Sequence, residues 1–292
     1  MSDLATGEIK YDIDLTPAFP RGCVLTDDGA TLFAASSKLV HVFDTTTMAC
    51  ATHDMPSNSG GAIAIAPDGK HVAVSSHGNH VAASSHGSHI SLYSVPSCVF
   101  QGKGKDTGSL AHCIAISPSS SLLAAGGREP YVHVSRFPGL GALFKIRAHR
   151  RWVNAVVFIH DDVLATGGDD GCVKLWRLEE SQCVPIRTLS MHTDMVYCMA
   201  LSPDGQTLAT GGADRKISII SLEDLTLVRS IVLRSSVTSI AWVDDATLLA
   251  AVFDDAVVEV DVSTGSVARP FAQHRGAINA ISISKGDGKS VI

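Results

Sequence analysis

The amino-acid sequence predicts an all-β fold built from repeated groups of short strands. In the segments that start at Val153, Val196 and Val237, apolar residues alternate with polar ones at a period of two. An amphipathic helix would instead space its apolar residues about 3.6 positions apart. The three segments also align with one another, each with an alternating stretch, a turn, a second apolar stretch, a Gly/Asp turn and a third strand. Repetition of this kind is typical of a β-propeller.

The length of the repeat can be measured from one marker position, the Pro of Ser-Pro-Asp-Gly or its equivalent. Five of the six successive spacings lie between 40 and 43 residues, within the range of about 40–45 expected for a blade of four strands. Seven markers predict seven blades. The markers are Asp27, Pro67, Pro118, His160, Pro203, Asp244 and Lys285.

The remaining spacing is the 51 residues between Pro67 and Pro118, and it falls in the second repeat. There HVAVSSHGN from His71 is followed by the near-copy HVAASSHGS from His80. Omitting one nine-residue copy restores a spacing of 42, so we expect a local duplication near residues 71–88 in blade two. Both copies fit the strand pattern, and the sequence leaves open which of them forms the second strand.

The seventh repeat is incomplete. Residues 277–283 fit its inner strand, and Lys289–Ile292 begin a second one. We expect blade seven to combine residues 277–292 with an N-terminal strand at residues 8–15, because such closure removes exposed sheet edges. Residues 1–292 then form a single propeller, and the end inside a blade also fits a polypeptide that continues past Ile292.

Blade four has His149 in a loop, Thr166 in a strand, Asp170 in a turn and Trp176 in the next strand. With this pattern and period, the chain resembles the WD40-repeat family over nearly its whole length. The resemblance implies that these four residues form the structural tetrad of that family, a hydrogen-bonded chain that holds a blade together. Buried polar groups are stable only when they are paired in this way.

The other blades depart from the family pattern. Blade five keeps the histidine, threonine and aspartate but has Ile220 in place of the tryptophan. Trp176 is followed by Arg177 rather than aspartate, blade six has Arg234 in place of the histidine, and blade seven keeps His274. The resemblance is therefore specific for architecture and weak for a subfamily.

A fainter likeness covers residues 10–127. The motifs TPAFPRG, LTDDGATLF and SPSSSLLAAGG are similar to the opening of the tandem-propeller WD proteins of the U3 snoRNP (the small-subunit processome), of the transducin-β-like type. This likeness implies a subunit of a ribonucleoprotein assembly in ribosome biogenesis.

Composition limits the partners and the compartment. The formal net charge of -6 and the pI of about 6.1 argue against direct DNA binding, and RNA contact is expected only within a complex. The seven cysteines include no C-x-x-C pair, which favours free thiols in a reducing compartment. No signal peptide and no run of about 20 apolar residues is visible. We expect an intracellular protein of the cytoplasm, nucleus or nucleolus, away from membranes.

Two groups of residues raise the question of chemistry. His71, His77, His80, His86 and His89 could present metal ligands, but their duplication favours an exposed loop, and we expect no metal. Paired acids such as Asp161–Asp162 and Asp244–Asp245 fall at repeated turn positions, where Asp bonds its own backbone. We therefore expect no catalytic residue and no cofactor, and the alternative is an enzyme with its active site in the central channel.

The loops that lead into the inner strands predict a binding face, because loops on a rigid scaffold commonly bind ligands. Trp152 lies beside two arginines, and Trp and Arg are frequent interface anchors. We interpret the protein as a non-enzymatic interaction scaffold whose partners are other proteins, including acidic or phosphorylated peptides held by arginine. A mixed solvated rim is the alternative interpretation. The residues of the expected face are Arg21, Arg128, Arg150, Arg151, Trp152, Arg215, Arg234 and Arg275.

Overall fold

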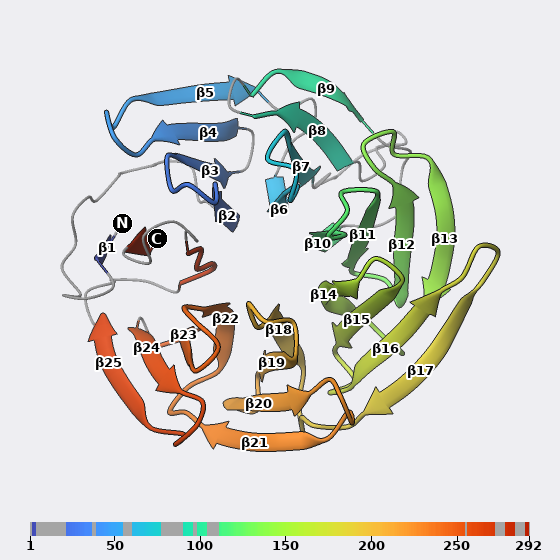
Figure 1. Ribbon diagram of the computed structural model, residues 1–292, viewed down its shortest axis with the longest axis vertical. Coiled ribbons are helices and arrows are strands. Elements are labelled where there is room, and N and C mark those ends of the chain that lie inside the picture. Colours follow the sequence, from blue (N-terminus) through green and yellow to red (C-terminus); the bar gives the residue numbers. More distant parts are fainter. Residues whose placement is uncertain are drawn as a thin grey trace, which may run out of the picture.

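The computed structural model describes residues 2–3, 22–36, 39–54, 60–76, 90–95, 98–103, 111–254, 256–271, 278–283 and 290–291. Six antiparallel sheets of four strands each are arranged as blades around a central axis (Figure 1). Blade one contains β2 (Gly22–Leu25), β3 (Thr31–Ala35), β4 (Leu39–Asp44) and β5 (Cys50–Asp54). Blade two contains β6 (Gly60–Ile65), β7 (His71–Ser76), β8 (Ile90–Ser94) and β9 (Phe100–Lys103). Blade three contains β10 (Ala111–Ile116), β11 (Leu122–Gly127), β12 (Tyr131–Arg136) and β13 (Ala142–Arg147). Blade four contains β14 (Val153–His160), β15 (Val163–Gly168), β16 (Val173–Leu178) and β17 (Cys183–Leu189). Blade five contains β18 (Val196–Leu201), β19 (Thr207–Gly212), β20 (Lys216–Ser221) and β21 (Leu227–Val232). Blade six contains β22 (Val237–Trp242), β23 (Thr247–Val252), β24 (Ala256–Asp261) and β25 (Val267–Phe271).

The all-β propeller is confirmed, but the predicted count of seven blades is wrong, because the described residues form six four-stranded blades. The seventh marker, Lys285, lies outside the described residues. A marker identifies a single turn, whereas a blade is defined by four paired strands. A short local motif therefore does not establish a blade.

The sector between blades six and one contains a two-stranded pair instead (Figure 1). β1 (Ser2–Asp3) pairs antiparallel with β26 (Ser290–Val291). The N-terminal strand expected at residues 8–15 lies outside the described residues. Residues 278–283, expected as an inner strand, lie between the first and sixth blades: Thr238 Oγ1 donates to the Ile278 carbonyl at 2.7 Å, and the Leu25 N–H donates to Ser282 Oγ at 3.0 Å.

The duplicated segment contributes its first copy to blade two. β7, at His71–Ser76, pairs with β8 in an unbroken register from His71 opposite Ser94 to Ser75 opposite Ile90. Residues 77–89, which include the end of the first copy and all of the second, lie outside the described residues.

The core lies between neighbouring blades. The second strand of a blade is covered on both faces, so it reads as a continuous run of apolar and small residues, as buried strands do. β15 (VLATGG) is an example, with every residue after Val163 buried. Trp176 of blade four packs in one cluster with Val132, Val134 and Ile146 of blade three. Blades therefore stabilise each other in pairs around the ring.

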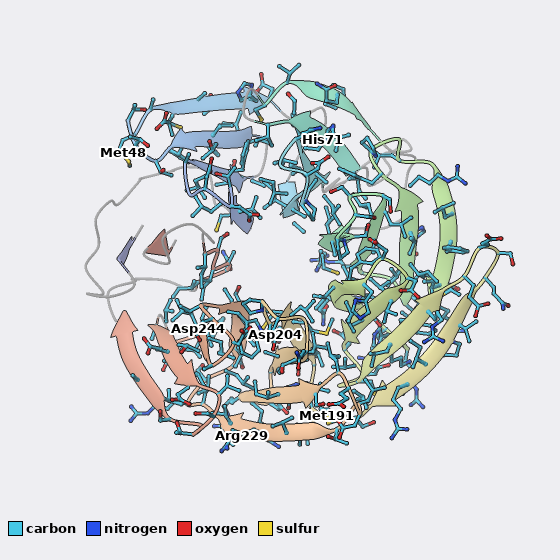
Figure 2. All side chains as sticks on the ribbon, in the orientation of Figure 1. Met48, His71, Met191, Asp204, Arg229 and Asp244 are labelled. Atoms are coloured by element: carbon cyan, nitrogen blue, oxygen red, sulfur yellow. The ribbon has the colours of Figure 1, made fainter. Side chains whose placement is uncertain are left out.

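Polar contacts also join neighbouring blades. On the outer rim, Arg229 of β21 reaches the turn after β24, where its Nη2 donates to the Ser263 carbonyl at 2.7 Å and its Nη1 to the Thr264 carbonyl at 3.2 Å (Figure 2). At the turns after the inner strands, the Asp204 N–H donates to Asp245 Oδ1 at 2.9 Å. These bonds fix the angle between adjacent blades.

The antiparallel order gives the ring two faces. The upper face contains the loops that lead into the inner strands and the turns between second and third strands, such as residues 148–152 and 169–172. The lower face contains the turns that join first to second and third to fourth strands, such as residues 161–162 and 179–182. None of the described segments forms a helix that could cross a membrane.

Candidate functional site

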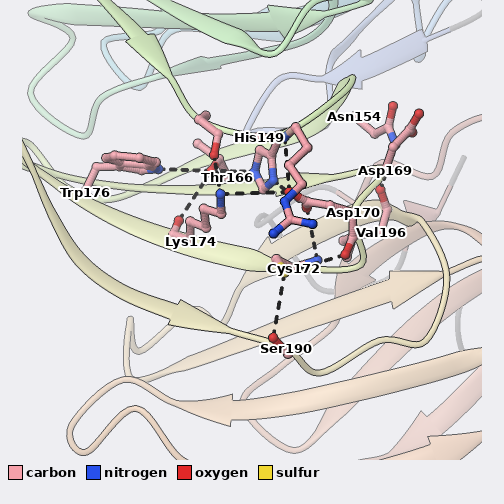
Figure 3. A network of polar contacts seen from close by, with 12 residues as sticks. His149, Asn154, Thr166, Asp169, Asp170, Cys172, Lys174, Trp176, Ser190 and Val196 are labelled. Carbon is pink, nitrogen blue, oxygen red and sulfur yellow. Dashed lines mark hydrogen bonds and ion pairs between the residues drawn. The ribbon is translucent and has the colours of Figure 1, made fainter.

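A chain of hydrogen bonds runs through blade four beneath the upper face (Figure 3). Trp176 Nε1 lies 3.1 Å from Thr166 Oγ1, which lies 2.9 Å from His149 Nε2. The other ring nitrogen, Nδ1, lies 2.7 Å from Asp170 Oδ1. The four residues come from β16, β15, the loop before β14 and the turn after β15, so the chain joins a loop and a turn to two strands.

The partners define the direction of these bonds. The indole N–H can only donate, so it donates to Thr166 Oγ1, and the Asp170 carboxylate can only accept, so it accepts from His149 Nδ1–H. The lowered pKa of His149 favours a neutral imidazole, in which Nε2 accepts the Thr166 hydroxyl. Burial lowers the pKa of His149, although the Asp170 carboxylate opposes this effect. Burial raises the pKa of Asp170, but the hydrogen bonds from His149 and from backbone N–H groups outweigh it and leave the pKa below its usual value.

The geometry of Thr166, His149 and Asp170 resembles that of a hydroxyl–imidazole–carboxylate triad, but these groups have no access to a substrate. Thr166 has no exposed surface and His149 is 2% exposed. The hydroxyl oxygen of Thr166 already accepts the Trp176 N–H. The chain therefore holds the blade together and presents no nucleophile at the surface.

The same network fixes the loop before β14. The Arg150 N–H donates to Asp170 Oδ2 at 3.2 Å, and the Asp169 N–H donates to the Trp152 carbonyl at 3.1 Å. Lys174 Nζ donates to the Ala148 carbonyl at 2.7 Å. The backbone that presents Arg150, Arg151 and Trp152 is thus bonded at three points to the rigid part of the blade.

The Gly-Gly pairs that end β15 and β19 are required by close packing. A Cβ atom on Gly167 would lie 2.7 Å from Val196 Cγ1 of the next blade, and one on Gly168 would lie 2.5 Å from Cγ of His149. The equivalent atom on Gly211 would lie 2.5 Å from Val237 Cγ1. One glycine of each pair admits the neighbouring blade, and Gly168 admits the tetrad histidine.

An aromatic and cationic cluster lies on the upper face where blades three and four meet. Trp152 is 41% exposed. The Arg128 guanidinium carbon lies 5.1 Å from the centre of the Trp152 ring, a cation–π contact. The His112 ring packs edge-on against the same indole, with 6.0 Å between ring centres, and its Nε2 accepts the Arg128 Nε–H at 3.2 Å. We call Trp152, Arg128 and His112 the Trp152 cluster.

Sequence reasoning did not single out His112, although a repeated signal marks it. In blades three to six the inner strand has a register shift after its first residue, so that the second residue lies in a β-bulge. Bulges redirect side chains and are frequent near functional sites. The side chain of the bulged Asn154 donates to the Val196 carbonyl of the next blade at 3.1 Å. The bulged residues are His112, Asn154, Tyr197 and Thr238.

The remaining residues of the expected face lie around this cluster or outside the described chain. Arg150 and Arg151 lie in the loop before β14, Arg215 in the turn between β19 and β20, and Arg234 in the loop before β22; all four are exposed. A cavity of about 270 Å³ adjoins Arg234 and is lined by valine and leucine. Arg21 and Arg275 lie outside the described residues.

Several aspartates of the same face already accept a hydrogen bond. Asp169 accepts from Asn154 at 2.9 Å, Asp170 from His149 and Asp214 from His192. In contrast, the guanidinium groups of Arg150, Arg151, Arg215 and Arg234 form no hydrogen bond or ion pair with the described part of the chain. The unpaired hydrogen-bonding groups described on the upper face are therefore mainly arginine donors.

The paired acids outside the tetrad serve turns and blade contacts. Asp244 Oδ1 accepts the Ala246 and Thr247 N–H groups at 2.9 and 2.7 Å. Asp161 accepts the Ser119 N–H of the preceding blade at 2.9 Å. Hydrogen bonds from Ser119 hold the pKa of Asp161 below its usual value. These carboxylates are acceptors that fix the backbone.

The histidines of the duplicated segment give no described metal site. His71 lies with Nδ1 3.3 Å from Asp68 Oδ2, and its ring packs against Phe137. His77, His80, His86 and His89 lie outside the described residues. Within the described ranges, no three His, Cys, Asp or Glu side chains are grouped so that they could hold a metal ion.

The model of the family "WD domain, G-beta repeat" matches residues 141–177 and 183–221, which include the tetrad residues of blade four. The chain is 36% identical over 108 residues to the ribosome biogenesis protein WDR12 homolog of Oryza sativa subsp. japonica, an alignment that covers 35% of this chain and 24% of the relative. It is 29% identical over 178 residues to protein SPA1-RELATED 4 of Arabidopsis thaliana, covering 58% and 22%. It is 29% identical over 77 residues to WD repeat-containing protein 55 of Bos taurus, covering 26% and 20%. The alignments span less than a quarter of the length of each of these relatives.

Proposed function

The chain carries WD40 repeats, and from this premise we propose that it is a non-enzymatic scaffold that binds other proteins within a larger assembly. The Trp152 cluster is the observation that supports this function most directly. An exposed indole held between Arg128 and His112 combines an apolar anchor with a cation, the two side-chain types most enriched at binding hot spots.

The unpaired arginines of this face indicate which chemical groups the partner presents. Arginines form forked hydrogen bonds with carboxylate and phosphate groups. Because Arg150 and Arg151 are unpaired while nearby aspartates are occupied, we propose that the face binds an acidic or phosphorylated segment of a partner protein.

The assembly that we propose belongs to ribosome biogenesis. The identity to the rice WDR12 homolog over about a third of the chain supports this choice, as do the sequence motifs shared with the tandem-propeller processome proteins. All seven cysteines are free, which fits an intracellular site in the nucleus, nucleolus or cytoplasm. RNA is then contacted only through the complex.

Affinity purification of the tagged chain followed by mass spectrometry tests the assembly. Recovery of pre-ribosomal proteins is the expected result, and a set of partners without any pre-ribosomal protein would contradict the assignment to ribosome biogenesis.

Single substitutions test the face. Arg151→Glu and Trp152→Ala should each reduce recovery of the partners at least tenfold, because they remove a cation and the anchor. The matched controls are Arg187→Glu and Ile186→Ala, on the exposed outer strand of the same blade. Unchanged recovery with both upper-face variants would show that the partners bind elsewhere.

A further inference from the structure

The lower face has a groove of about 700 Å³ where blades three and four meet. Its floor comes from the start of β11, the end of β12, the start of β13 and the end of β16. Leu122, Phe144 and Leu178 line it from the interblade core, and Leu143 remains 37% exposed at its edge. The volume lies within the range of about 300–1,000 Å³ typical of binding pockets.

Carboxylates form the rim of this groove. Asp161 and Asp162 come from the turn between β14 and β15, and Glu179 and Glu180 from the turn between β16 and β17. Among the lining residues, Arg136 is the one cation. The groove therefore joins an apolar floor to a strongly negative rim, whereas the unpaired groups of the upper face are arginines.

The rim carboxylates differ in whether they already accept a hydrogen bond. Asp161 accepts the Ser119 N–H, and Glu179 Oε2 accepts from Gln182 at 2.7 Å. Asp162 and Glu180 are exposed, and their carboxylates form no hydrogen bond or ion pair with the part of the chain that the structure describes. Two acceptors are thus left beside an apolar floor that water covers poorly.

We propose that this groove binds a basic segment of a partner protein, in which a leucine or aromatic side chain is flanked by lysines or arginines. The apolar side chain enters between Leu143 and Leu178, and the flanking cations pair with Asp162 and Glu180. Complementary charge at the rim selects the partner and fixes its orientation, while the apolar anchor supplies affinity. Phosphate-bearing ligands, nucleic acid among them, are repelled by the same rim.

The groove goes beyond the proposed upper-face function, because it shares no residue with the Trp152 cluster and lies on the opposite face. A scaffold with two such surfaces can bind an acidic and a basic partner at the same time. The two surfaces can be tested separately for this reason.

The binding test uses the full chain and fluorescence anisotropy with labelled peptides. The probe has a Leu-Phe centre flanked on each side by three Lys or Arg residues; one comparison peptide has Ser-Ser at the centre, and the other has Glu and Asp as flanks. We expect saturable binding of the probe and at least tenfold weaker binding of both comparison peptides. Equal affinity for the three peptides, or no binding of the probe at millimolar concentration, would overturn the proposal.

Variants then locate the site. Asp162→Lys/Glu180→Lys should weaken probe binding at least tenfold, and Leu143→Ser about fivefold, with unchanged circular dichroism because the replaced side chains are exposed. Glu223→Lys is the matched control in the equivalent turn of blade five and should leave affinity within twofold. Unchanged affinity in both groove variants would overturn the proposal.

Two further measurements distinguish the groove from the upper face and from a contact between two copies of the chain. Arg151→Glu and Trp152→Ala should leave probe binding unchanged, so a failure of the upper-face function does not affect this result. Analytical ultracentrifugation tests whether a second copy of the chain occupies the groove. If the chain dimerises, and if Asp162→Lys/Glu180→Lys and Trp152→Ala each abolish the dimer, the occupant is the chain itself and the proposal of a partner protein is overturned.

Discussion

Blades four and five contain the same three polar residues but differ in the fourth. In blade five, His192 Nε2 lies 2.8 Å from Thr210 Oγ1 and Nδ1 lies 2.9 Å from Asp214 Oδ1, nearly the distances of blade four. At the position of Trp176, however, blade five has the fully buried Ile220. The histidine, threonine and aspartate are thus sufficient to bond the loop to the turn, and the tryptophan adds a separate contact.

That contact joins the polar chain to the neighbouring blade. The Trp176 ring packs against residues of blade three, while its N–H donates to Thr166. Ile220 fills its place by apolar packing alone, in a cluster with Leu175 and Val196. Each threonine hydroxyl also lies near a strand carbonyl, that of Lys174 at 3.5 Å or of Ser218 at 3.4 Å. The two blades therefore differ in the tryptophan N–H, which the hydroxyl oxygen accepts in blade four and which blade five lacks.

The largest difference is expected when the hydroxyl is removed. Thr166→Val leaves both Trp176 Nε1 and His149 Nε2 unpaired in the core, whereas Thr210→Val leaves only His192 Nε2 unpaired. Each buried unpaired group costs about 1–3 kcal/mol. We expect Thr166→Val to lower the free energy of unfolding by about 3 kcal/mol and Thr210→Val by about 1.5 kcal/mol, measured by urea unfolding.

The two variants are matched controls for each other, because both exchange a fully buried threonine for an isosteric valine. Equal losses of stability would show that the tryptophan bond contributes nothing, and blades four and five would then be equivalent.

A smaller loss is expected from the tryptophan itself. Trp176→Phe removes the N–H donor and part of the packing, and should cost about 1–2 kcal/mol. In a Thr166→Val background the same substitution should cost less, because the donor no longer has a partner. The two substitutions share one bond, so their effects should not add. Additive losses in the double-mutant cycle would contradict a direct Trp176–Thr166 bond.

The sequence predicted what depends on local pattern. Alternation and turn residues located the segments that became β14, β18 and β22. The tetrad positions were expected from the resemblance to the WD40-repeat family. The marker at Lys285 did not predict a described blade, because a marker identifies one turn and a blade is defined by four paired strands.

Features that depend on contact between blades could not be predicted in the same way. The bulge at His112 arises from the pairing of β10 with β11, and the contact of this residue with Trp152 spans two blades. The lower groove needs Leu143 and Glu180, from different blades, to be placed side by side. Polar or aromatic residues at the second position of the inner strands of blades three to six were the available signal for the bulges.

The smallest effect is expected from pH. Burial lowers the pKa of His149 in the folded protein, whereas in the unfolded chain it titrates near its ordinary value of about 6.5. The folded state therefore binds fewer protons, so the contribution of His149 is complete above about pH 6.5 and is lost as pH falls from there toward the folded pKa. Urea unfolding at pH 7.5 and 5.5 should show a loss of at most about 1.4 kcal/mol per pH unit from this residue. His149→Gln cannot titrate, so it should flatten the pH dependence of the free energy of unfolding while lowering stability at both pH values. If the variant instead shows a pH dependence as steep as that of the unsubstituted chain, His149 does not stay neutral in the blade.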